Sequence, residues 1–209
     1  MLVTKVKPED ELIGILPKNL FVIHCLGCKE VYFPLEDALK LTSSLKGMGV
    51  NVISEEMTDY LCRPDYTSRR LELYSDAMNG ADGVLVFSCG VGVQTVAELV
   101  SEKSDIPVFT GCDTMHLSGF TGLKPTELDC ERCGECVLGR TAGICPVANC
   151  AKGLLNGPCG GAMNGKCEVD SEKDCIWLLI YKRLKEQGRE ELMKGKSYTR
   201  DYTRAEKGI

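Results

Sequence analysis

Short apolar runs alternate with amphipathic stretches through the first half of the chain. Four runs rich in β-forming residues predict buried strands at residues 20–24, 50–54, 83–88 and 106–110. Apolar residues at helical spacing predict helices at residues 8–16, 34–45 and 66–78, and a fourth that follows the loop 89–94 and ends near Lys103. In the third helix, the residues expected from this spacing to face inward are Tyr66, Leu73, Tyr74 and Ala77. Because parallel strands need a crossover, usually a helix, we expect an α/β fold with a small Rossmann-like parallel sheet of about four strands.

The second half of the chain has little periodicity. Residues 113–129 hold glycine and proline with few large apolar side chains, which predicts a linker. Residues 176–187 predict a C-terminal helix whose apolar stripe is formed by Trp177, Ile180, Tyr181 and Leu184. Residues 194–207 have five basic and two acidic residues, so we expect a solvated end, with a docking tail as the alternative. This organisation predicts an α/β domain at 1–121, a cysteine-rich domain at 122–193 with little regular structure, and a basic tail at 194–209.

Cysteine is the residue that carries the candidate chemistry. Eight of the 13 cysteines lie within 46 residues: Cys130, Cys133, Cys136, Cys145, Cys150, Cys159, Cys167 and Cys175. The first three have C-x2-C-x2-C spacing, which suits one metal centre, and eight thiolates would serve two [4Fe–4S] clusters. Structural zinc often uses paired C-x2-C knuckles and fits less well, because the other five cysteines are spread singly. Only the triplet is assigned to one cluster; its fourth ligand and the division of the remaining cysteines stay open.

The five N-terminal cysteines follow the predicted strands: Cys25, Cys28, Cys62, Cys89 and Cys112. Parallel sheets gather ligands beyond the carboxyl ends of their strands, so we expect a third metal site formed by the first four, with Cys112 as the spare. The alternative is that these cysteines pack as small apolar residues in the core. His24 and His116, the two histidines, are either ligands or acid–base groups, or simply hydrogen-bonded polar residues.

Composition and charge exclude several classes of protein. A formal net charge of −5 without a long basic stripe disfavours a nucleic-acid partner, and no apolar run approaches the length of a membrane span. The odd number of cysteines and the lack of a signal-peptide pattern favour a cytoplasmic protein with metal or redox chemistry over a disulfide framework. The loop Cys89-Gly-Val-Gly only half-matches a dinucleotide-binding pattern, because Thr95 stands where a third small residue is needed.

Several motifs resemble a known family. The stretch Cys150-Ala-Lys-Gly-Leu-Leu-Asn-Gly-Pro-Cys159-Gly-Gly, together with Gly143-Ile-Cys145-Pro and Asn164-Gly-Lys-Cys167, resembles the C-terminal domain associated with methylenetetrahydrofolate reductase. The N-terminal cysteines resemble the rest of the MetV-type small subunit. The resemblance covers nearly the whole chain.

The resemblance implies an accessory iron–sulfur subunit of a heteromeric complex in the methyl branch of one-carbon metabolism, the Wood–Ljungdahl pathway. Such a subunit would itself be non-catalytic, and would relay electrons to a flavin-containing methylenetetrahydrofolate reductase catalytic subunit, with further electron-transfer subunits as possible partners. This chain carries no flavin motif, so the flavin is expected in the partner. Two other hypotheses remain: a zinc-binding adaptor that stabilises the catalytic subunit, and a freestanding nucleotide-dependent oxidoreductase.

Overall fold

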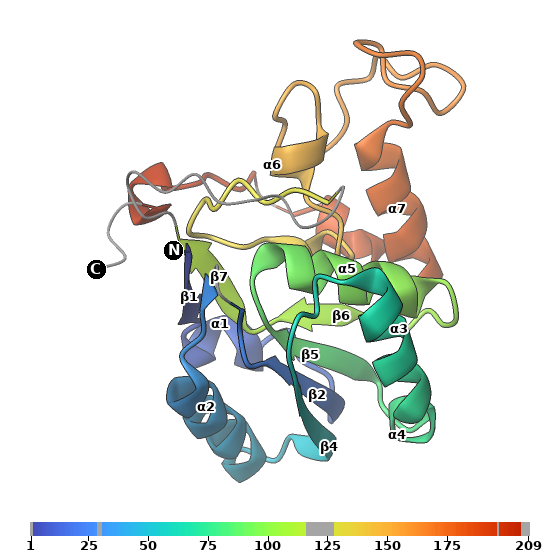
Figure 1. Ribbon diagram of the computed structural model, residues 1–209. Coiled ribbons are helices and arrows are strands. Elements are labelled where there is room, and N and C mark those ends of the chain that lie inside the picture. Colours follow the sequence, from blue (N-terminus) through green and yellow to red (C-terminus); the bar gives the residue numbers. More distant parts are fainter. Residues whose placement is uncertain (1, 29–30, 116–127, 196, 206–209) are drawn as a thin grey trace.

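A four-stranded parallel sheet forms the centre of the N-terminal half. The computed structural model describes residues 2–28, 31–115, 128–195 and 197–205 (Figure 1). The strands are β2 (Asn19–Cys25), β4 (Asn51–Thr58), β5 (Gly83–Phe87) and β6 (Val108–Thr110). Their spatial order is β4-β2-β5-β6, so the chain winds outward in both directions from the boundary between β2 and β5. This is a doubly wound arrangement, and it confirms the predicted α/β fold.

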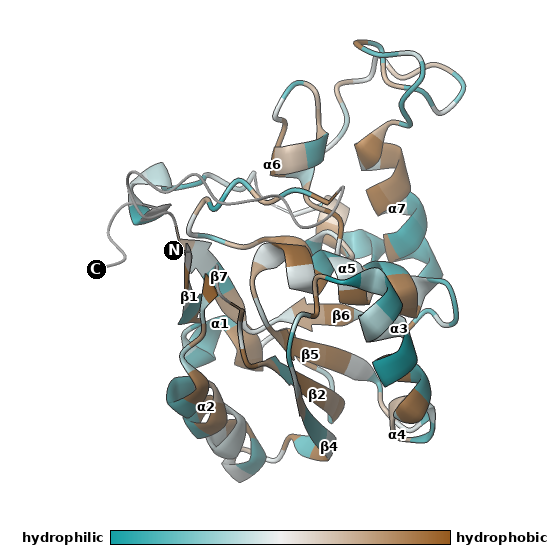
Figure 2. Ribbon diagram, viewed as in Figure 1, coloured by the Kyte–Doolittle hydropathy of each residue, from teal (hydrophilic) through white to brown (hydrophobic). Residues whose placement is uncertain are grey.

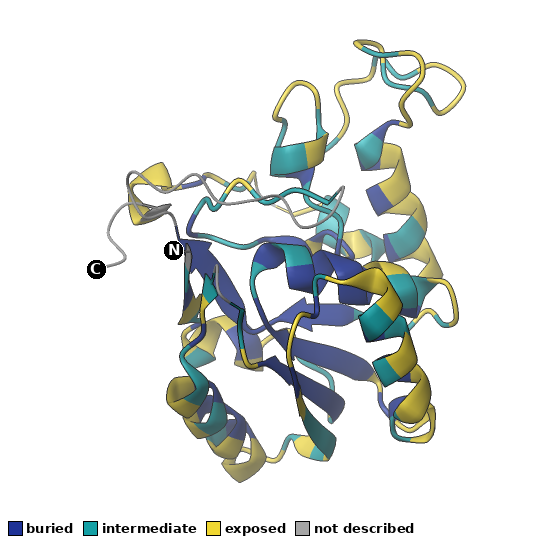
Figure 3. Cartoon of the chain, in the orientation of Figure 1, coloured by how far each residue is buried: buried dark blue, intermediate teal, exposed yellow. Residues whose placement is uncertain are grey.

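Helices cover both faces of the sheet because the strands are apolar on both sides. On β2, Leu20 and Val22 pack in one core with α1 (Glu9–Ile13) and α2 (Leu35–Gly47). Phe21 and Ile23 point the other way, into a core completed by α3 (Pro64–Leu73), α4 (Ser75–Asn79) and α5 (Gly90–Ser101). Figure 3 shows the central strands as the buried layer between helices whose outer faces are exposed.

The sequence pattern did not predict a second, smaller sheet. It consists of β1 (Leu2–Val6), β3 (Val31–Tyr32) and β7 (Cys112–Met115), in the order β3-β1-β7. Strands β1 and β7 are antiparallel and nearly a whole domain apart in the chain. The predicted linker is therefore wrong for residues 113–115, and residues 116–127 of it, with His116, lie outside the described residues. Strand β7 is the last described element before the cysteine-rich segment.

The predicted helix at 66–78 is two helices, because the backbone leaves the helical conformation at Tyr74 (φ −104°, ψ 13°). This break changes which residues face inward. Leu71 is buried whereas Leu73 is 73% exposed, so its predicted inward orientation was wrong. The Tyr66 hydroxyl accepts hydrogen bonds from Thr58 and Arg70 at the edge of the domain.

The cysteine-rich segment has little regular structure, as predicted. Its elements are the short 3-10 turns η1 (Leu138–Arg140), η2 (Glu190–Met193) and η3 (Tyr202–Ala205), and the helices α6 (Pro146–Asn149) and α7 (Ile176–Glu186). Helix α7 buries Trp177, Ile180 and Leu184 in a small separate core, whereas Tyr181 is exposed and does not join the predicted stripe. In Figure 2 the end of α7 nearest α6 is hydrophobic, and the rest of the helix is mainly hydrophilic. The lobe formed by α6, α7 and the loop between them projects from the sheet domain (Figure 1).

Candidate metal centres

One cavity lies beyond the carboxyl edge of the central sheet. Four cysteines line it: Cys25, Cys28, Cys62 and Cys89. Cys25 ends β2, Cys62 follows β4 and Cys89 follows β5, so the strands themselves deliver these side chains to one place. The cavity lies where the strand order reverses, between β2 and β5, the position at which doubly wound sheets bind ligands. We call it the sheet-edge cavity. The structure thus brings together the four N-terminal cysteines that the sequence singled out.

Burial desolvates two thiols of the sheet-edge cavity, those of Cys89 and Cys62. Burial raises the pKa of Cys89 to about 11, although the backbone amides of Gly92 and Val91 at the start of α5 point at its sulfur and oppose that shift. Burial and the neighbouring Cys28 and Cys25 likewise raise the pKa of Cys62. These thiols are therefore neutral near pH 7, and a metal that binds them must displace their protons.

Ser88 adds a polar group to the same cavity. Its hydroxyl oxygen is buried and, among the described residues, has no hydrogen-bond partner. Ser88 lines the sheet-edge cavity and has a free donor. Because a buried hydroxyl without a partner is costly, this donor is available to a group bound in the cavity. Gly92 makes room for it, because a Cβ atom at Gly92 would overlap the Ser88 hydroxyl oxygen.

A second cavity lies between α5 and the cysteine-rich segment. Four more cysteines line it: Cys130, Cys133, Cys136 and Cys145. The sequence left the partner of the C-x2-C-x2-C triplet open, and the structure places Cys145 against it. Arg200, from the C-terminal tail, lines the same wall. We call this the triplet cavity.

The triplet cavity is held against the second sheet. Met115 of β7 forms a β-bridge with Cys133, and the Gly134 amide donates to the Thr114 carbonyl at 3.0 Å. The Asp113 carboxylate accepts a hydrogen bond from the Cys136 amide at 2.7 Å and lies 2.8 Å from the Lys7 ammonium. Strand β7 therefore sets the position of two of the three cysteines of the triplet, although the sequence pattern did not predict this strand.

In the triplet cavity, burial and the neighbouring charges and amides shift the pKa values in opposite directions. Burial raises the pKa of Cys136 to about 12, against the lowering effects of the Leu138 amide and of Lys7. Burial alone would lower the pKa of Lys7, but the Asp113 carboxylate holds it above its ordinary value. Burial also raises the pKa of Cys145, although the Ala148 and Val147 amides at the start of α6 point at its sulfur.

A single peptide unit separates the two cavities. Cys89 lines the sheet-edge cavity, and the next residue, Gly90, lines the triplet cavity. A Cβ atom at Gly90 would lie 2.7 Å from the Cys130 sulfur, closer than real Cβ contacts, so only glycine fits here without a shift. The Gly90 amide donates to the Thr114 hydroxyl at 2.9 Å, which fixes this peptide in place.

The other cysteines are distributed differently. Cys150 and Cys175 pack in the small core of α7, while Cys167 is half-buried and Cys159 is exposed in the loop between α6 and α7. Cys112 is buried with apolar side chains of β2 and β5 and lies outside the linings of both cavities. None of the 13 cysteines, all of which the structure describes, forms a disulfide bond. Within the described ranges, no three His, Cys, Asp or Glu side chains meet closely enough to hold one metal ion.

His24 is a buried core residue. Its ring stacks on Phe87 with 4.8 Å between centroids, and its Nε2 atom lies 3.0 Å from the Glu55 carboxylate. Burial lowers its pKa, against the effect of Glu55, so the ring is held neutral. It lies outside the linings of both cavities, which fits the simpler of its two predicted roles.

Residues 109–203 match the family described as methylene-tetrahydrofolate reductase C terminal. The match covers somewhat less than half of the chain and includes the four cysteines of the triplet cavity, the α6–α7 lobe and most of the tail. This segment is therefore similar to the C-terminal part of proteins related to methylene-tetrahydrofolate reductase. Neither a curated protein nor a solved structure matches the chain. In the part of the chain that the structure describes, no helix has the length and apolarity needed to cross a membrane.

Proposed function

We propose that this chain is an accessory electron-transfer subunit of a methylenetetrahydrofolate reductase complex, of the MetV type, that holds [4Fe–4S] clusters. The proposal rests above all on one observation: two cavities are each lined by four cysteines and by a buried donor with unmet hydrogen bonds. The similarity of residues 109–203 to the reductase C-terminal family supports the choice of complex.

The donor set of each cavity fits a four-iron cluster. Such a cluster takes four thiolates on four separate irons, so its ligands surround a space and need not converge on a point. The sheet-edge and triplet cavities each offer four thiols around a space, together with the Ser88 hydroxyl in one and the Arg200 guanidinium in the other. Donors of this kind bind the sulfur atoms of clusters. A structural zinc ion would instead draw all four sulfurs onto itself.

The chain's own residues would hold and shield these groups. We assign Cys25, Cys28, Cys62 and Cys89 to the sheet-edge site, and Cys130, Cys133, Cys136 and Cys145 to the triplet site. Cys150, Cys159, Cys167 and Cys175 remain for a third site in the α6–α7 lobe. When bound, the clusters would supply one-electron transfer.

The reduction itself belongs to a partner in this proposal. Converting methylenetetrahydrofolate to methyltetrahydrofolate takes two electrons at one carbon, and we assign the hydride transfer to a flavin-bearing catalytic subunit. The sheet-edge and triplet cavities are each lined by four thiols, which suits a metal cluster and not a flavin. The chain on its own should therefore not reduce the folate.

Metal analysis of the anaerobically purified chain tests the proposal. We expect about 12 irons and about 12 acid-labile sulfides per chain, four of each for each cluster. Zinc at the same sites, with little iron, would instead favour the structural adaptor. Folate reduction should appear only after the flavin subunit is added, and turnover by the isolated chain would overturn the accessory role.

A further inference from the structure

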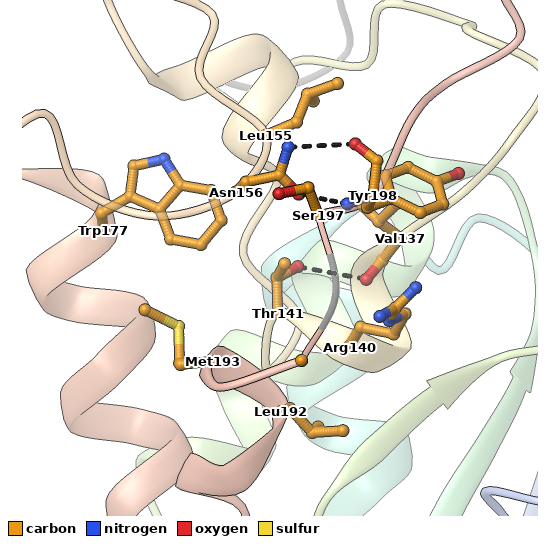
Figure 4. Close-up of a pocket in the computed structure, with 11 residues that line it drawn as sticks. Val137, Arg140, Thr141, Leu155, Asn156, Trp177, Leu192, Met193, Ser197 and Tyr198 are labelled. Atoms are coloured by element: carbon orange, nitrogen blue, oxygen red, sulfur yellow. Dashed lines mark hydrogen bonds between the residues drawn. The ribbon is translucent and has the colours of Figure 1, made fainter.

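The C-terminal tail is docked over the triplet cavity, contrary to the expectation of a solvated end. Asn156 and Tyr198 exchange two hydrogen bonds, of 3.0 Å from the Asn156 side-chain amide and 2.6 Å from the Tyr198 backbone amide (Figure 4). The Arg140 guanidinium lies over the Tyr198 ring, 5.3 Å from its centroid. Further along, the Asp201 amide donates to the Glu135 carboxylate at 3.4 Å. The tail therefore has anchors on both sides of residue 200.

Arg200 is the buried charge of this tail. It is only 7% exposed, and its Nη2 atom donates to the Glu135 carbonyl at 2.9 Å. Its guanidinium also lies 5.6 Å from the centroid of the Tyr202 ring. Among the described residues, neither its Nε nor its Nη1 atom has a hydrogen-bond acceptor. Burying a cation with two N–H groups unmet is costly unless an anion lies next to it.

Arg200, which carries these two free N–H groups, lines the cavity that four cysteines also line. The cysteine sulfurs of the triplet cavity share this wall with the guanidinium, and they become anionic when a metal displaces their protons. Glu135, the nearby carboxylate, already accepts from Asp201 and lies 3.8 Å from Arg204.

We propose that Arg200 is a positioning residue of the triplet site, which donates hydrogen bonds from Nε and Nη1 to the sulfur atoms of the anionic cluster held there and raises its reduction potential. The inference rests on the proposed function, because it requires a cluster at this site. A fixed positive charge favours the more negative, reduced form of a cluster, and hydrogen bonds to its sulfurs act in the same direction. Anchoring the tail explains Nη2, which donates to the Glu135 carbonyl, but it does not explain Nε and Nη1, because an arginine that only anchors the tail would place these on protein acceptors as well.

The test compares three variants of the full chain, purified anaerobically. Arg200→Gln removes the charge, and Arg200→Lys keeps the charge but loses the planar pair of donors. Arg204→Gln is the matched control, because Arg204 lies in the same tail, loses the same charge and is half exposed. The readout is a redox titration followed by electron paramagnetic resonance. The signal of the triplet site is identified as the one that Cys136→Ser removes.

We expect Arg200→Gln to keep the wild-type iron content and to lower the midpoint of the triplet-site signal. The expected change is about tenfold in the one-electron equilibrium, which corresponds to about 59 mV. Arg200→Lys should retain part of the wild-type potential, and Arg204→Gln should leave it unchanged. An unchanged midpoint in Arg200→Gln would overturn the inference.

A loss of iron would be interpreted differently in the Arg200 variants and in the wild-type chain. If Arg200→Gln loses about four irons, one cluster, retention of that iron in Arg200→Lys supports the role of the charge. Equal loss in both variants overturns it, because the residue is then needed only for its shape. A wild-type chain that holds no iron refutes the proposed function itself, which is a different result from an unchanged midpoint.

Discussion

Asp113 links the α/β domain to the triplet cavity, and its charge can be removed without changing its shape. In Asp113→Asn the side chain can still accept from the Cys136 amide, but the Lys7 ammonium loses the carboxylate that lies 2.8 Å away. Both side chains are buried, with 6% exposure for Lys7 and 10% for Asp113. Glu11 remains 3.0 Å from Lys7, but it is 37% exposed and is a weaker partner.

These contacts set the size of the expected effect. Removing one partner of a buried ion pair costs about 3–5 kcal/mol, because the other charge is left buried and unpaired. Since Glu11 still neutralises part of the Lys7 charge, we expect Asp113→Asn to lose about 2–3 kcal/mol. For a chain of this size, that corresponds to a fall of about 5–10 °C in the apparent unfolding temperature.

Thermal unfolding of the anaerobic protein, followed by circular dichroism, measures this change. The control is Glu72→Gln, which breaks the exposed pair between Glu72 and Lys103, 3.2 Å apart, and should cost less than about 1 kcal/mol. Adding Lys7→Met to Asp113→Asn should restore most of the lost stability, because the double variant has no buried charge left without a partner at this position. The reasoning fails if Asp113→Asn melts like the control, or if the double variant is as unstable as the sum of the two single ones.

Three further changes test other parts of the structure. Cys62→Ser should remove about four irons per chain while Cys112→Ser leaves the iron content unchanged, as metal analysis of the two variants will show; equal iron contents would contradict the sheet-edge assignment. Gly92→Ala should displace the Ser88 hydroxyl, cost about 1–3 kcal/mol in unfolding free energy through overpacking and alter the absorption spectrum of the sheet-edge site, and a wild-type spectrum and melting curve would argue against that contact. Ile180→Ala should lower the free energy of unfolding by about 2–5 kcal/mol, because Ile180 is a fully buried residue of α7. A thermal melt unchanged from wild type would show that this small core does not stabilise the lobe.

Local pattern was sufficient for the central sheet. Strands β2 and β5 are continuous apolar runs, and such runs form strands that are buried on both faces wherever helices can cover them. The second sheet left no comparable pattern, because β7 reads Cys-Asp-Thr-Met and β1 contains a lysine. These two segments are strands because they pair with each other, Val3 with Met115 and Val6 with Cys112, across more than a hundred residues. A pairing between distant segments cannot be read from the composition of either one.

The candidate site divides in the same way. Chain order alone put Cys25, Cys62 and Cys89 at the carboxyl ends of parallel strands, so their meeting at one edge followed from the fold class. The fixed spacing of the C-x2-C-x2-C triplet likewise grouped its three cysteines, because short turns bring neighbouring side chains together whatever the rest of the chain does.

Tertiary structure decided what completes the triplet cavity. Cys145 joins it only because the chain from η1 to α6 folds back, and Arg200 joins it only because the tail returns to Glu135, 65 residues earlier in the chain. From the sequence, a basic residue in a polar tail predicts a solvated end, since its burial depends on an anionic surface that distant residues build. The sequence by itself therefore determined the sheet and the grouping of nearby cysteines, which follow from local periodicity and spacing. The neighbours of each buried charge depended on contacts between distant segments, and these have no local signature.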